Sequence, residues 1–232
     1  MGRVFCIVGK SSSGKDTIYK KLLQNPSLHL KRIVLYTTRP IRAGEREGEE
    51  YHFTTIERMI QLQEENKIIE CRSYDTIYGV WYYFMAKDSQ INLKENDYLI
   101  IGTLESYTRI RAYFGKDKVL PIYIDLDDGE RLTRALEREK MQSQPGYVEM
   151  CRRYLADEKD FSADNLERAG ITAKFDNYNL STCLDEVADY IIAHREQDRS
   201  TFDARPHVEE VCRRSDAWGA QPVGEDGSSL RD

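Results

Sequence analysis

The fold of this chain is decided by the stretch VFCIVGKSSSGKDT, residues 4–17. Its first five residues form a continuous apolar run, which predicts a buried strand. Residues 9–15 fit the pattern G-x-x-x-x-G-K, and residues 16–24 place apolar side chains on one face of a helix. A glycine-rich loop between a strand and a helix is the setting in which this pattern binds phosphate. A plain Gly/Ser turn is the alternative, and the flanking strand and helix make it the weaker one.

The loop has the chemistry that a nucleoside triphosphate requires. Its glycines let the backbone wrap inward, so that successive N–H groups point at one anion, and the helix after the loop adds its positive end. Lys15 supplies a compact positive charge for the β- and γ-phosphates. We therefore expect ATP to contact a run of nine residues: Gly9, Lys10, Ser11, Ser12, Ser13, Gly14, Lys15, Asp16 and Thr17.

Asp16 departs from the usual form of this loop. The position after the lysine ordinarily carries Ser or Thr, whose hydroxyl binds Mg²⁺, and here Thr17 comes one step later. A carboxylate beside a triphosphate is repelled unless a cation lies between them. Asp16 either binds Mg²⁺ directly or through water, or it faces away and is favoured only by the helix N-terminus. We slightly favour the metal role.

The rest of the chain predicts an α/β fold with a mainly parallel sheet. Further apolar runs that predict strands occur at 33–36, 98–101 and 119–124, where Pro121 weakens the last strand or places it at an edge. Helical patterns lie between them, and the alternation indicates a parallel sheet flanked by helices. From residue 196 the composition changes to charge, Gly and Ser, which predicts one domain over 1–195 and a disordered tail over 196–232.

Composition excludes several classes of protein. The 232 residues carry 34 Lys and Arg against 40 Asp and Glu, a net charge of −6, which argues against a general nucleic-acid binder. No apolar run approaches the length of a membrane span, and no signal-peptide pattern opens the sequence. The five cysteines are scattered without a C-x-x-C pair. Together these features predict a cytoplasmic protein with reduced thiols.

A second motif narrows the function. Residues 36–53 read YTTRPIRAGEREGEEYHF, and Arg39 and Arg42 flank Pro40 in a stiff loop that can hold a monophosphate through bidentate bonds. At this point the sequence resembles the guanylate kinase family, which carries T-T-R-x-x-R-x-G-E-x-x-G-x-x-Y-x-F after its phosphate loop. The resemblance extends over roughly residues 3 to 195. It implies a P-loop nucleoside monophosphate kinase with a small acceptor-binding insert at about 37–95 and an arginine-bearing lid at about 134–153.

The resemblance also implies roles for acceptor-binding residues. Arg39, Arg42 and Tyr51 would hold the acceptor phosphate, Glu70 would accept hydrogen bonds from the guanine base, and Tyr78 would stand for the family's tyrosine before glycine. A carboxylate suits guanine because it accepts from N1–H and the 2-amino group together. Glu70 as a surface charge and Tyr78 as a core aromatic are the structural alternatives.

An arginine cluster resembles the family's lid. Arg134 and Arg138 lie four residues apart on one predicted helix face, and Arg153 lies on the next helix. By the resemblance, Arg138 and Arg153 act with Lys15 and Arg39 in catalysis, Arg134 contacts ATP, and Asn177 lies near the adenine. A closing lid brings positive charge to the transferred group and expels water. A solvated helix face, paired with neighbouring glutamates, is the alternative.

Three positions depart from the family pattern around the acceptor. Leu35, Val80 and Thr103 stand where the family has serine, serine or threonine, and a carboxylate. Buried polar groups of this kind select the base, so their replacement puts the identity of the acceptor in question. Asp16 would restore the carboxylate lost at Thr103. The expected function is transfer of phosphate from ATP, with Mg²⁺, to a nucleoside monophosphate, GMP above all. A kinase for another small phosphorylated molecule and a non-catalytic phosphopeptide-binding module remain alternatives.

Overall fold

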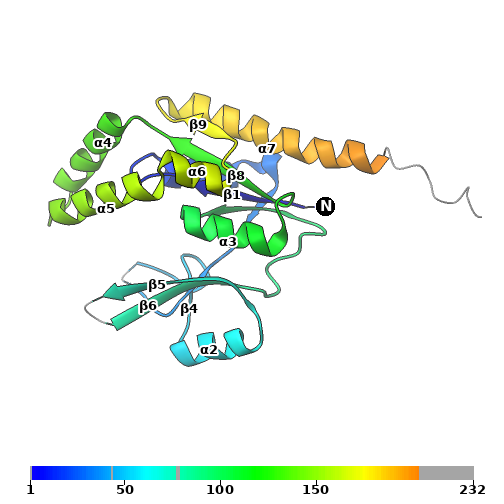
Figure 1. The fold of residues 1–232 in the computed structure, drawn as a ribbon, viewed down its shortest axis with the longest axis horizontal. Coiled ribbons are helices and arrows are strands. Elements are labelled where there is room, and N and C mark those ends of the chain that lie inside the picture. Colours follow the sequence, from blue (N-terminus) through cyan, green and yellow to red (C-terminus); the bar gives the residue numbers. More distant parts are fainter. Residues whose placement is uncertain (1, 43, 77–78, 204–232) are drawn as a thin grey trace, which may run out of the picture.

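The strand that leads into the phosphate loop lies at the centre of a five-stranded sheet (Figure 1). The computed structural model describes residues 2–42, 44–76 and 79–203. The strands of this sheet are, in spatial order, β2 (Leu30–Arg32), β7 (Asp97–Ile101), β1 (Val4–Val8), β8 (Val119–Asp125) and β9 (Lys174–Asp176). Every pair of neighbours is parallel. The predicted α/β fold with a parallel sheet flanked by helices is therefore confirmed.

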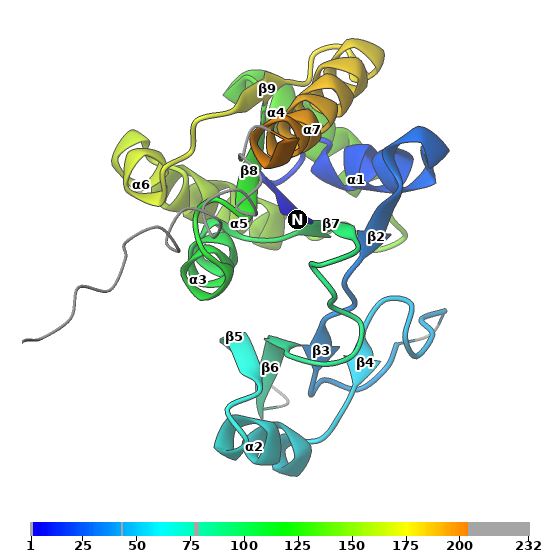
Figure 2. The same cartoon turned by 90° about the vertical axis from the view of Figure 1, so that its right-hand side faces the viewer.

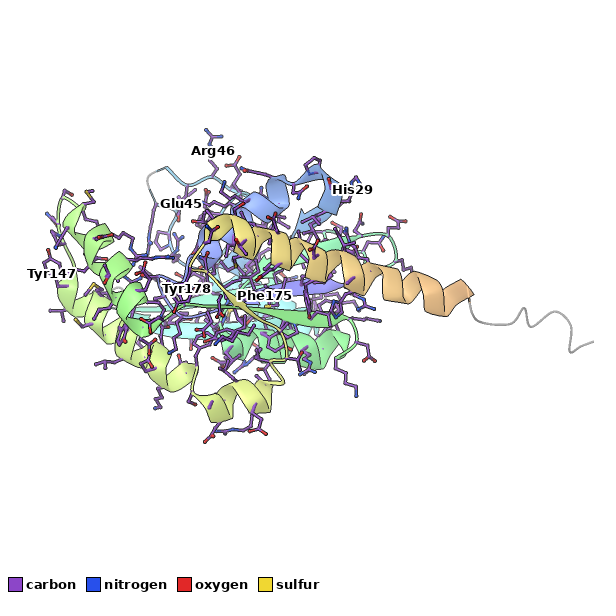
Figure 3. All side chains as sticks on the ribbon, turned by 90° about the horizontal axis from the view of Figure 1, so that it is seen from above. His29, Glu45, Arg46, Tyr147, Phe175 and Tyr178 are labelled. Atoms are coloured by element: carbon purple, nitrogen blue, oxygen red, sulfur yellow. The ribbon has the colours of Figure 1, made fainter. Side chains whose placement is uncertain are left out.

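The sheet is covered on both faces because side chains of β1 alternate between two cores. Phe5 and Ile7 pack with α1 (Lys15–Gln24), the short helix η1 (Pro26–Leu28) and α7 (Leu180–Asp203). Figure 3 shows Phe175 of β9 against α7, on this same face. The other side chains of β1 pack with α3 (Leu104–Phe114), α6 (Ala163–Ala169) and the end of α5 (Tyr147–Asp160).

A second, smaller sheet lies beside the first, below it in Figures 1 and 2. Its strands, in spatial order, are β4 (His52–Phe53), β3 (Tyr36–Thr37), β6 (Gly79–Ala86) and β5 (Ile68–Thr76). The helix α2 (Ile56–Glu64) packs on it and forms a third small core with Met59, Leu62 and Phe84. Contact with the first sheet runs through α3, whose Arg109 donates to the Cys71 carbonyl at 2.9 Å. The larger unit also carries α4 (Asp128–Lys140), which pairs with α5 as a helical hairpin.

The strand predicted at 33–36 is wrong in its position. The structure ends β2 at Arg32 and starts β3 at Tyr36, so residues 33–35 connect the two sheets. Their apolar character has another cause, because Ile33 and Leu35 pack into the core of the first sheet. Gln90 takes the place of a strand partner, since its side-chain oxygen accepts from Val34 N at 2.7 Å and its amide donates to Val34 O at 3.1 Å.

Pro121 lies within a strand that has neighbours on both sides, β1 and β9. However, β9 pairs only with the segment of β8 from Tyr123 to Asp125, and Pro121 pairs with β1 alone. Proline is tolerated there because that part of β8 has an open side, where a missing N–H breaks no ladder bond. Pro121 therefore lies at a position with one open side, as the prediction of an edge requires, although β8 as a whole is not an edge strand.

The end of the described chain is helical. The predicted boundary at residue 195 falls inside α7, which continues to Asp203, and residues 204–232 lie outside the described part. Within the described residues, no helix is long and apolar enough to cross a membrane. The four cysteines that the structure describes, Cys6, Cys71, Cys151 and Cys183, are free thiols.

Candidate functional site

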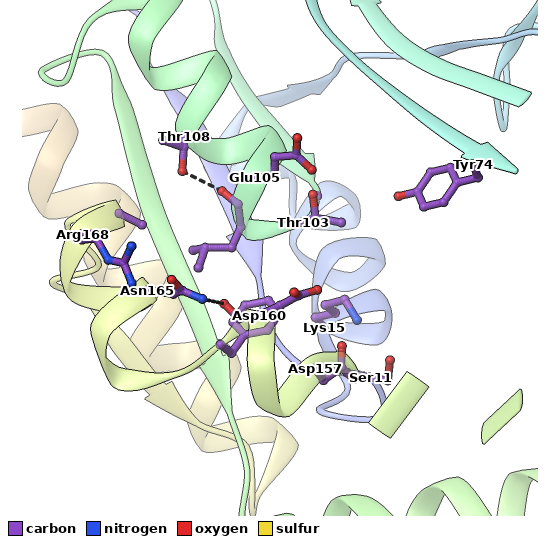
Figure 4. Close-up of a pocket in the computed structure, with 15 residues that line it drawn as sticks. Ser11, Lys15, Tyr74, Thr103, Glu105, Thr108, Asp157, Asp160, Asn165 and Arg168 are labelled. Carbon is purple, nitrogen blue, oxygen red and sulfur yellow. Dashed lines mark hydrogen bonds between the residues drawn. The ribbon is translucent and has the colours of Figure 1, made fainter. Parts of the chain in front are cut away.

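A cavity of about 560 Å³ opens beside the phosphate loop (Figure 4). The loop provides one wall, the start of α3 another, and the ends of α5 and α6 a third, while Tyr74 reaches it from β5 of the second sheet. The polar residues that line it are Ser11, Lys15, Tyr74, Thr103, Glu105, Thr108, Asp157, Asp160, Asn165 and Arg168. The volume suits a nucleotide-sized ligand.

The loop itself has the geometry of an anion cradle. Ser12 and Gly14 adopt the left-handed conformation, with φ of 64° and 87°, which turns the backbone around the loop interior. The hydroxyls of Ser12 and Ser13 are buried and find no hydrogen-bond partner among the described residues. Polar groups left in this state are an expected feature of a site that binds a polar ligand. A side chain at Gly14 would overlap the Asn177 amide, so glycine is required here on two grounds.

Lys15 is a largely buried cation without a strong partner in the described structure. Its side chain is 19% exposed, its Nζ lies 3.4 Å from the Lys10 carbonyl, and Asp16 is 4.0 Å away. Burial lowers the pKa of Lys15. The charges of Asp16 and Asp157 raise this pKa, and those of Arg138 and Arg153 lower it further. An anionic ligand would remove this cost, because it favours the charged ammonium.

Asp157 of α5 occupies one amide of the loop. Its Oδ2 accepts from Ser11 N at 2.7 Å, and its charge acts on Lys15. A carboxylate oxygen therefore stands at a position that a phosphate oxygen would take in a filled loop. The sequence did not indicate Asp157, because nothing in the spacing of residues 150–160 relates α5 to the loop.

Buried Arg131 ties the loop to α4 and α5. Its guanidinium donates to Asp128 and Glu158, each at 2.6 Å, and to the Ser11 carbonyl at 3.2 Å. Lys10 extends the same cluster, with its Nζ 2.8 Å from Glu158 and 3.2 Å from Asp128. The side chain of Lys10, a predicted ATP ligand, is therefore bound in an ion-pair network with α4 and α5. Arg131 also holds the loop backbone in place through the Ser11 carbonyl.

The predicted lid arginines lie close to the loop. Arg138 and Arg153 line a small hollow with Ser11 and Ser12. Glu139 is buried between α4 and α5, where it accepts from Gly146 N at 2.9 Å and lies 3.9 Å from Arg153. The carboxylate of Glu139 thereby holds the connection between α4 and α5 in place.

Arg134 and Asn177, which the sequence assigns to ATP and to its adenine end, are in contact with each other. The side-chain amide of Asn177 donates to Ser13 O at 2.7 Å, and the backbone carbonyl of Asn177 accepts from Arg134 at 3.3 Å. Asn177 is buried, and its Oδ1 has no partner within the described residues. In this arrangement Asn177 supports the phosphate loop from behind.

The predicted acceptor-phosphate residues form a cluster on the second sheet. Arg39 is 4% exposed and makes a bidentate pair with Glu45, at 2.7 and 2.6 Å. Its guanidinium lies 5.1 Å from the Tyr51 ring centre and 5.4 Å from that of Phe53. Burial raises the pKa of Tyr51, so its hydroxyl stays protonated and can donate. Arg42 donates its backbone N–H to Glu45 at 2.8 Å. The sequence did not indicate that Glu45 would neutralise Arg39.

The predicted base-reading residue does not face the cavity. The Glu70 side chain is fully buried, and Arg72 binds both of its oxygens, at 3.1 and 3.3 Å. It is not a surface charge either, which removes that alternative. Among the described residues, neither Glu70, Arg39 nor Tyr51 lines the cavity beside the loop. Tyr78, the other predicted base contact, lies outside the described residues.

The three departures have distinct positions. Leu35 packs against the core of the first sheet, and Val80 is 39% exposed on β6. Thr103 lines the cavity and caps α3, because its hydroxyl accepts from Ser106 N at 3.1 Å. Asp16 is 79% exposed in the first turn of α1. Thr17, also in that turn, donates its N–H to Gly14 O at 3.0 Å.

The oxygen donors around the cavity fit a metal that arrives with its ligand. No three His, Cys, Asp or Glu side chains gather into a metal-binding group within the part of the chain that the structure describes. Mg²⁺ in nucleotide sites commonly takes one or two carboxylates and completes its shell with phosphates and water. Asp16, Asp157 and Glu105 are carboxylates of this kind near the loop or the cavity.

Comparison with known proteins agrees with this geometry. A family model described as guanylate kinase matches residues 1–81, which hold the phosphate loop and the acceptor-phosphate segment. The guanylate kinase of Porphyromonas gingivalis is 26% identical over 189 residues, covering 81% of this chain and 95% of that protein. That of Schizosaccharomyces pombe is 35% identical over 89 residues, or 38% of this chain and 44% of that protein.

A solved structure shares the fold. The guanylate kinase from Anaplasma phagocytophilum superposes with a TM-score of 0.55 at 21% identity, over 83% of this chain and 85% of that one. At this identity the structural likeness concerns the fold alone. The matched family segment carries the loop and the arginine motif, and one relative is matched along nearly its whole length. The chain is thus similar to guanylate kinases in sequence over the matched segments, and similar to one of them in fold.

Proposed function

We propose that this chain transfers the γ-phosphoryl group of ATP to a nucleoside monophosphate, and that GMP is the first acceptor to test. The proposal rests on the similarity to guanylate kinases and on two clusters that match two phosphate groups. One is the loop with Lys15, and the other is Arg39 with Tyr51. The proposed place of action is the cytoplasm, where ATP and mononucleotides occur together.

On the donor side, the loop amides and Lys15 would bind the β- and γ-phosphates. Arg138 and Arg153 would add positive charge as the group is transferred, since both already act on Lys15 electrostatically. Asn177 and Arg134 hold the loop from the opposite side. Mg²⁺ would supply charge neutralisation for the phosphates, with Asp16 as the candidate protein ligand.

On the acceptor side, Arg39 would exchange its bond to Glu45 for the acceptor phosphate. The guanidinium fork that now holds a carboxylate fits a phosphate equally well. Tyr51 would add a hydroxyl bond. No covalent intermediate is needed, because alignment of the two phosphates and electrostatic stabilisation account for most of the acceleration in such reactions.

The observation that carries the proposal is Lys15. A largely buried ammonium without a carboxylate in hydrogen-bond contact, beside buried hydroxyls without partners in the described structure, calls for a bound anion. A phosphopeptide-binding module would have no use for such a loop, since its ligand occupies the acceptor site alone.

The test is a coupled assay of ADP release with ATP, Mg²⁺ and a panel of nucleoside monophosphates. We expect turnover with GMP, and Lys15→Met should lower it by about 100-fold or more, as loss of a transition-state contact does. Lys20→Met, on the exposed side of the same helix, is the matched control and should retain the rate. Folded protein that releases ADP with no acceptor on the panel would refute the proposal and favour the binding module.

A further inference from the structure

Both carboxylate oxygens of Glu70 have a hydrogen-bond partner within the protein. Its side chain is fully buried, and Arg72 lies 3.1 Å from one carboxylate oxygen and 3.3 Å from the other. A guanine base would present N1–H and its 2-amino group to the same two oxygens. The Nε–H and Nη2–H groups of Arg72 form a fork of the same kind. Arg72 therefore occupies the bonding position of a guanine edge.

The strand geometry explains why Arg72 stands in front of Glu70. Residues 70, 72 and 74 share one face of β5, because side chains alternate along a strand. Tyr74 is the member of this series that lines the cavity. Arg72 lies between Tyr74 and Glu70 along this face of β5, and its side chain is 11% exposed.

The charge of the same guanidinium acts on the acceptor-phosphate cluster. The charges of Arg39 and Arg72 both act on the Tyr51 hydroxyl and lower its pKa against the effect of burial. Arg72 is thus a second cation beside the residue that would bind the acceptor phosphate. The face that this part of β5 offers to a ligand carries a guanidinium and a phenol, and no free carboxylate.

Other groups near Glu70 do not replace Arg72. Arg109 acts on Glu70 only through its charge, because its own bonds go to Glu105 at 2.6 Å and the Cys71 carbonyl. Burial nevertheless raises the pKa of Glu70, so the pair with Arg72 is what favours its charged form. A ligand that displaced Arg72 would have to match both of its bonds.

We propose that Arg72 is a specificity-determining residue that satisfies Glu70 internally, so that this enzyme selects its acceptor by the phosphate and with little preference for guanine. The inference rests on the proposed phosphoryl transfer. It deepens that proposal by widening the acceptor class to phosphorylated molecules whose base, if any, is not read by a carboxylate.

The test compares kcat/KM for GMP and IMP, which differ only in the 2-amino group. A carboxylate that reads guanine would favour GMP by about 10- to 100-fold, the effect of one hydrogen bond to a charged group. We expect a ratio below about 3 for the wild type, since Glu70 is not free to make that bond. Arg72→Met should raise the ratio to about 10 or more, because a bound guanine edge can then supply the hydrogen bonds that favour the charged form of buried Glu70.

Controls separate this effect from a general disturbance. Arg109→Met removes the neighbouring arginine and should leave the ratio unchanged. The double variant Glu70→Gln/Arg72→Met removes both charges, so it avoids a lone buried carboxylate and is expected to fold and to keep the wild-type ratio. Equilibrium binding of GMP and IMP by calorimetry gives the same ratio without turnover.

The outcomes distinguish the two proposals. A wild-type ratio of about 10 or more, or an unchanged ratio in Arg72→Met with turnover retained, would overturn the role of Arg72 and leave the kinase proposal standing. If Arg72→Met does not fold, the wild-type ratio decides. Absence of binding and transfer with every monophosphate would overturn the proposed function, and the inference with it.

Discussion

At the scale of single residues, carboxylates of the protein stand at both positions where phosphates are expected. Asp157 accepts from the Ser11 amide, and Glu45 binds both arms of Arg39. Each pairing gives a donor group of the protein a hydrogen-bond partner. Each of these two pairings must be broken before a phosphate binds there. Breaking them costs free energy, which lowers the affinity for the ligand.

Asp157→Ala should strengthen ATP binding. The change frees the Ser11 amide and removes a negative charge near Lys15, so the Kd for ATP should fall roughly 3- to 10-fold, the worth of one hydrogen bond. Calorimetric titration measures this directly. Asp160→Ala is the matched control, because Asp160 lines the same cavity and its side chain makes no bond to the loop in the described structure. Weaker binding in Asp157→Ala would instead assign Asp157 to the bound nucleotide or its metal.

Glu45 should contribute stability that depends on acid pH. Its hydrogen bonds from Arg39 lower the pKa of Glu45 to about 2, from an ordinary value of 4.5. A lowered pKa means that the contribution is complete above pH 4.5 and is lost as the pH falls through about 2. The difference in unfolding free energy between the wild type and Glu45→Gln should therefore be constant near neutrality and shrink below pH 4.5. Urea unfolding at a series of pH values checks this, and a difference that grows in acid would contradict it.

At the scale of elements, buried Arg131 joins the α4–α5 hairpin to the phosphate loop, alongside the bonds of Asp157 and Lys10. Arg131 is 1% exposed and reaches both helices and the loop, with the Tyr154 ring 4.8 Å from its guanidinium carbon. The arginines of the predicted lid lie further along the same hairpin. The position of the loop is thus coupled to the orientation of α4 and α5.

Arg131→Met should loosen this coupling and destabilise the fold. Because Asp128 and Glu158 are partly exposed, we expect a loss of about 2–3 kcal/mol, below the value for a fully buried ion pair. The KM for ATP should rise as well, since Ser11 loses its support. Arg152→Met, whose partner Glu149 is on the surface of α5, should leave the unfolding free energy nearly unchanged. Equal effects of the two substitutions in urea would contradict the coupling.

The elements differ in how far the sequence could predict them. The local sequence pattern was sufficient to predict β1, the phosphate loop and α1, because these three elements follow one another directly along the chain. Local pattern failed at residues 33–35, which connect the two sheets. Their apolar side chains pack into the core of the first sheet, and the backbone of Val34 forms its hydrogen bonds with the distant Gln90. The site residues Asp157 and Arg72 were also missed. Asp157 pairs with the distant Ser11, which no local spacing reveals. Arg72 stands only two residues from Glu70, and their pairing was missed because no strand was predicted over residues 68–76.

At the scale of the whole molecule, three separate cores support the fold. Two lie on the faces of the parallel sheet, and the third is the small group under α2. The long helix α7 belongs to the first unit, where Cys183, Val187 and Ile191 are fully buried. In Figure 3 the start of α5, marked by Tyr147, lies at the opposite end of the molecule from the end of α7.

Truncation should distinguish the contribution of α7 from that of residues 204–232. A chain that ends at Asp203 should unfold with nearly the same free energy as the full chain and show the same acceptor profile. A chain that ends at residue 179 should not fold, because burial of each large apolar side chain contributes about 1.5–3 kcal/mol and the total stability of a domain is about 5–15 kcal/mol. Circular dichroism and urea unfolding report both results. Loss of activity in the chain that ends at Asp203 would assign a role to residues 204–232.

The unequal burial of the two ends of the β5–β6 hairpin has a consequence for how the hairpin opens. Met85 and Ile69 at one end of the hairpin pack into a core of the parallel sheet, while Tyr74 and Val80 at the other end are exposed. Amide protons should therefore exchange with deuterium along a gradient, fastest near the exposed end and slowest beside Met85. Arg72 lies on the intermediate part of that gradient. The residue that covers Glu70 would thus be released by a partial opening of the hairpin, at a lower free energy than unfolding of the whole protein.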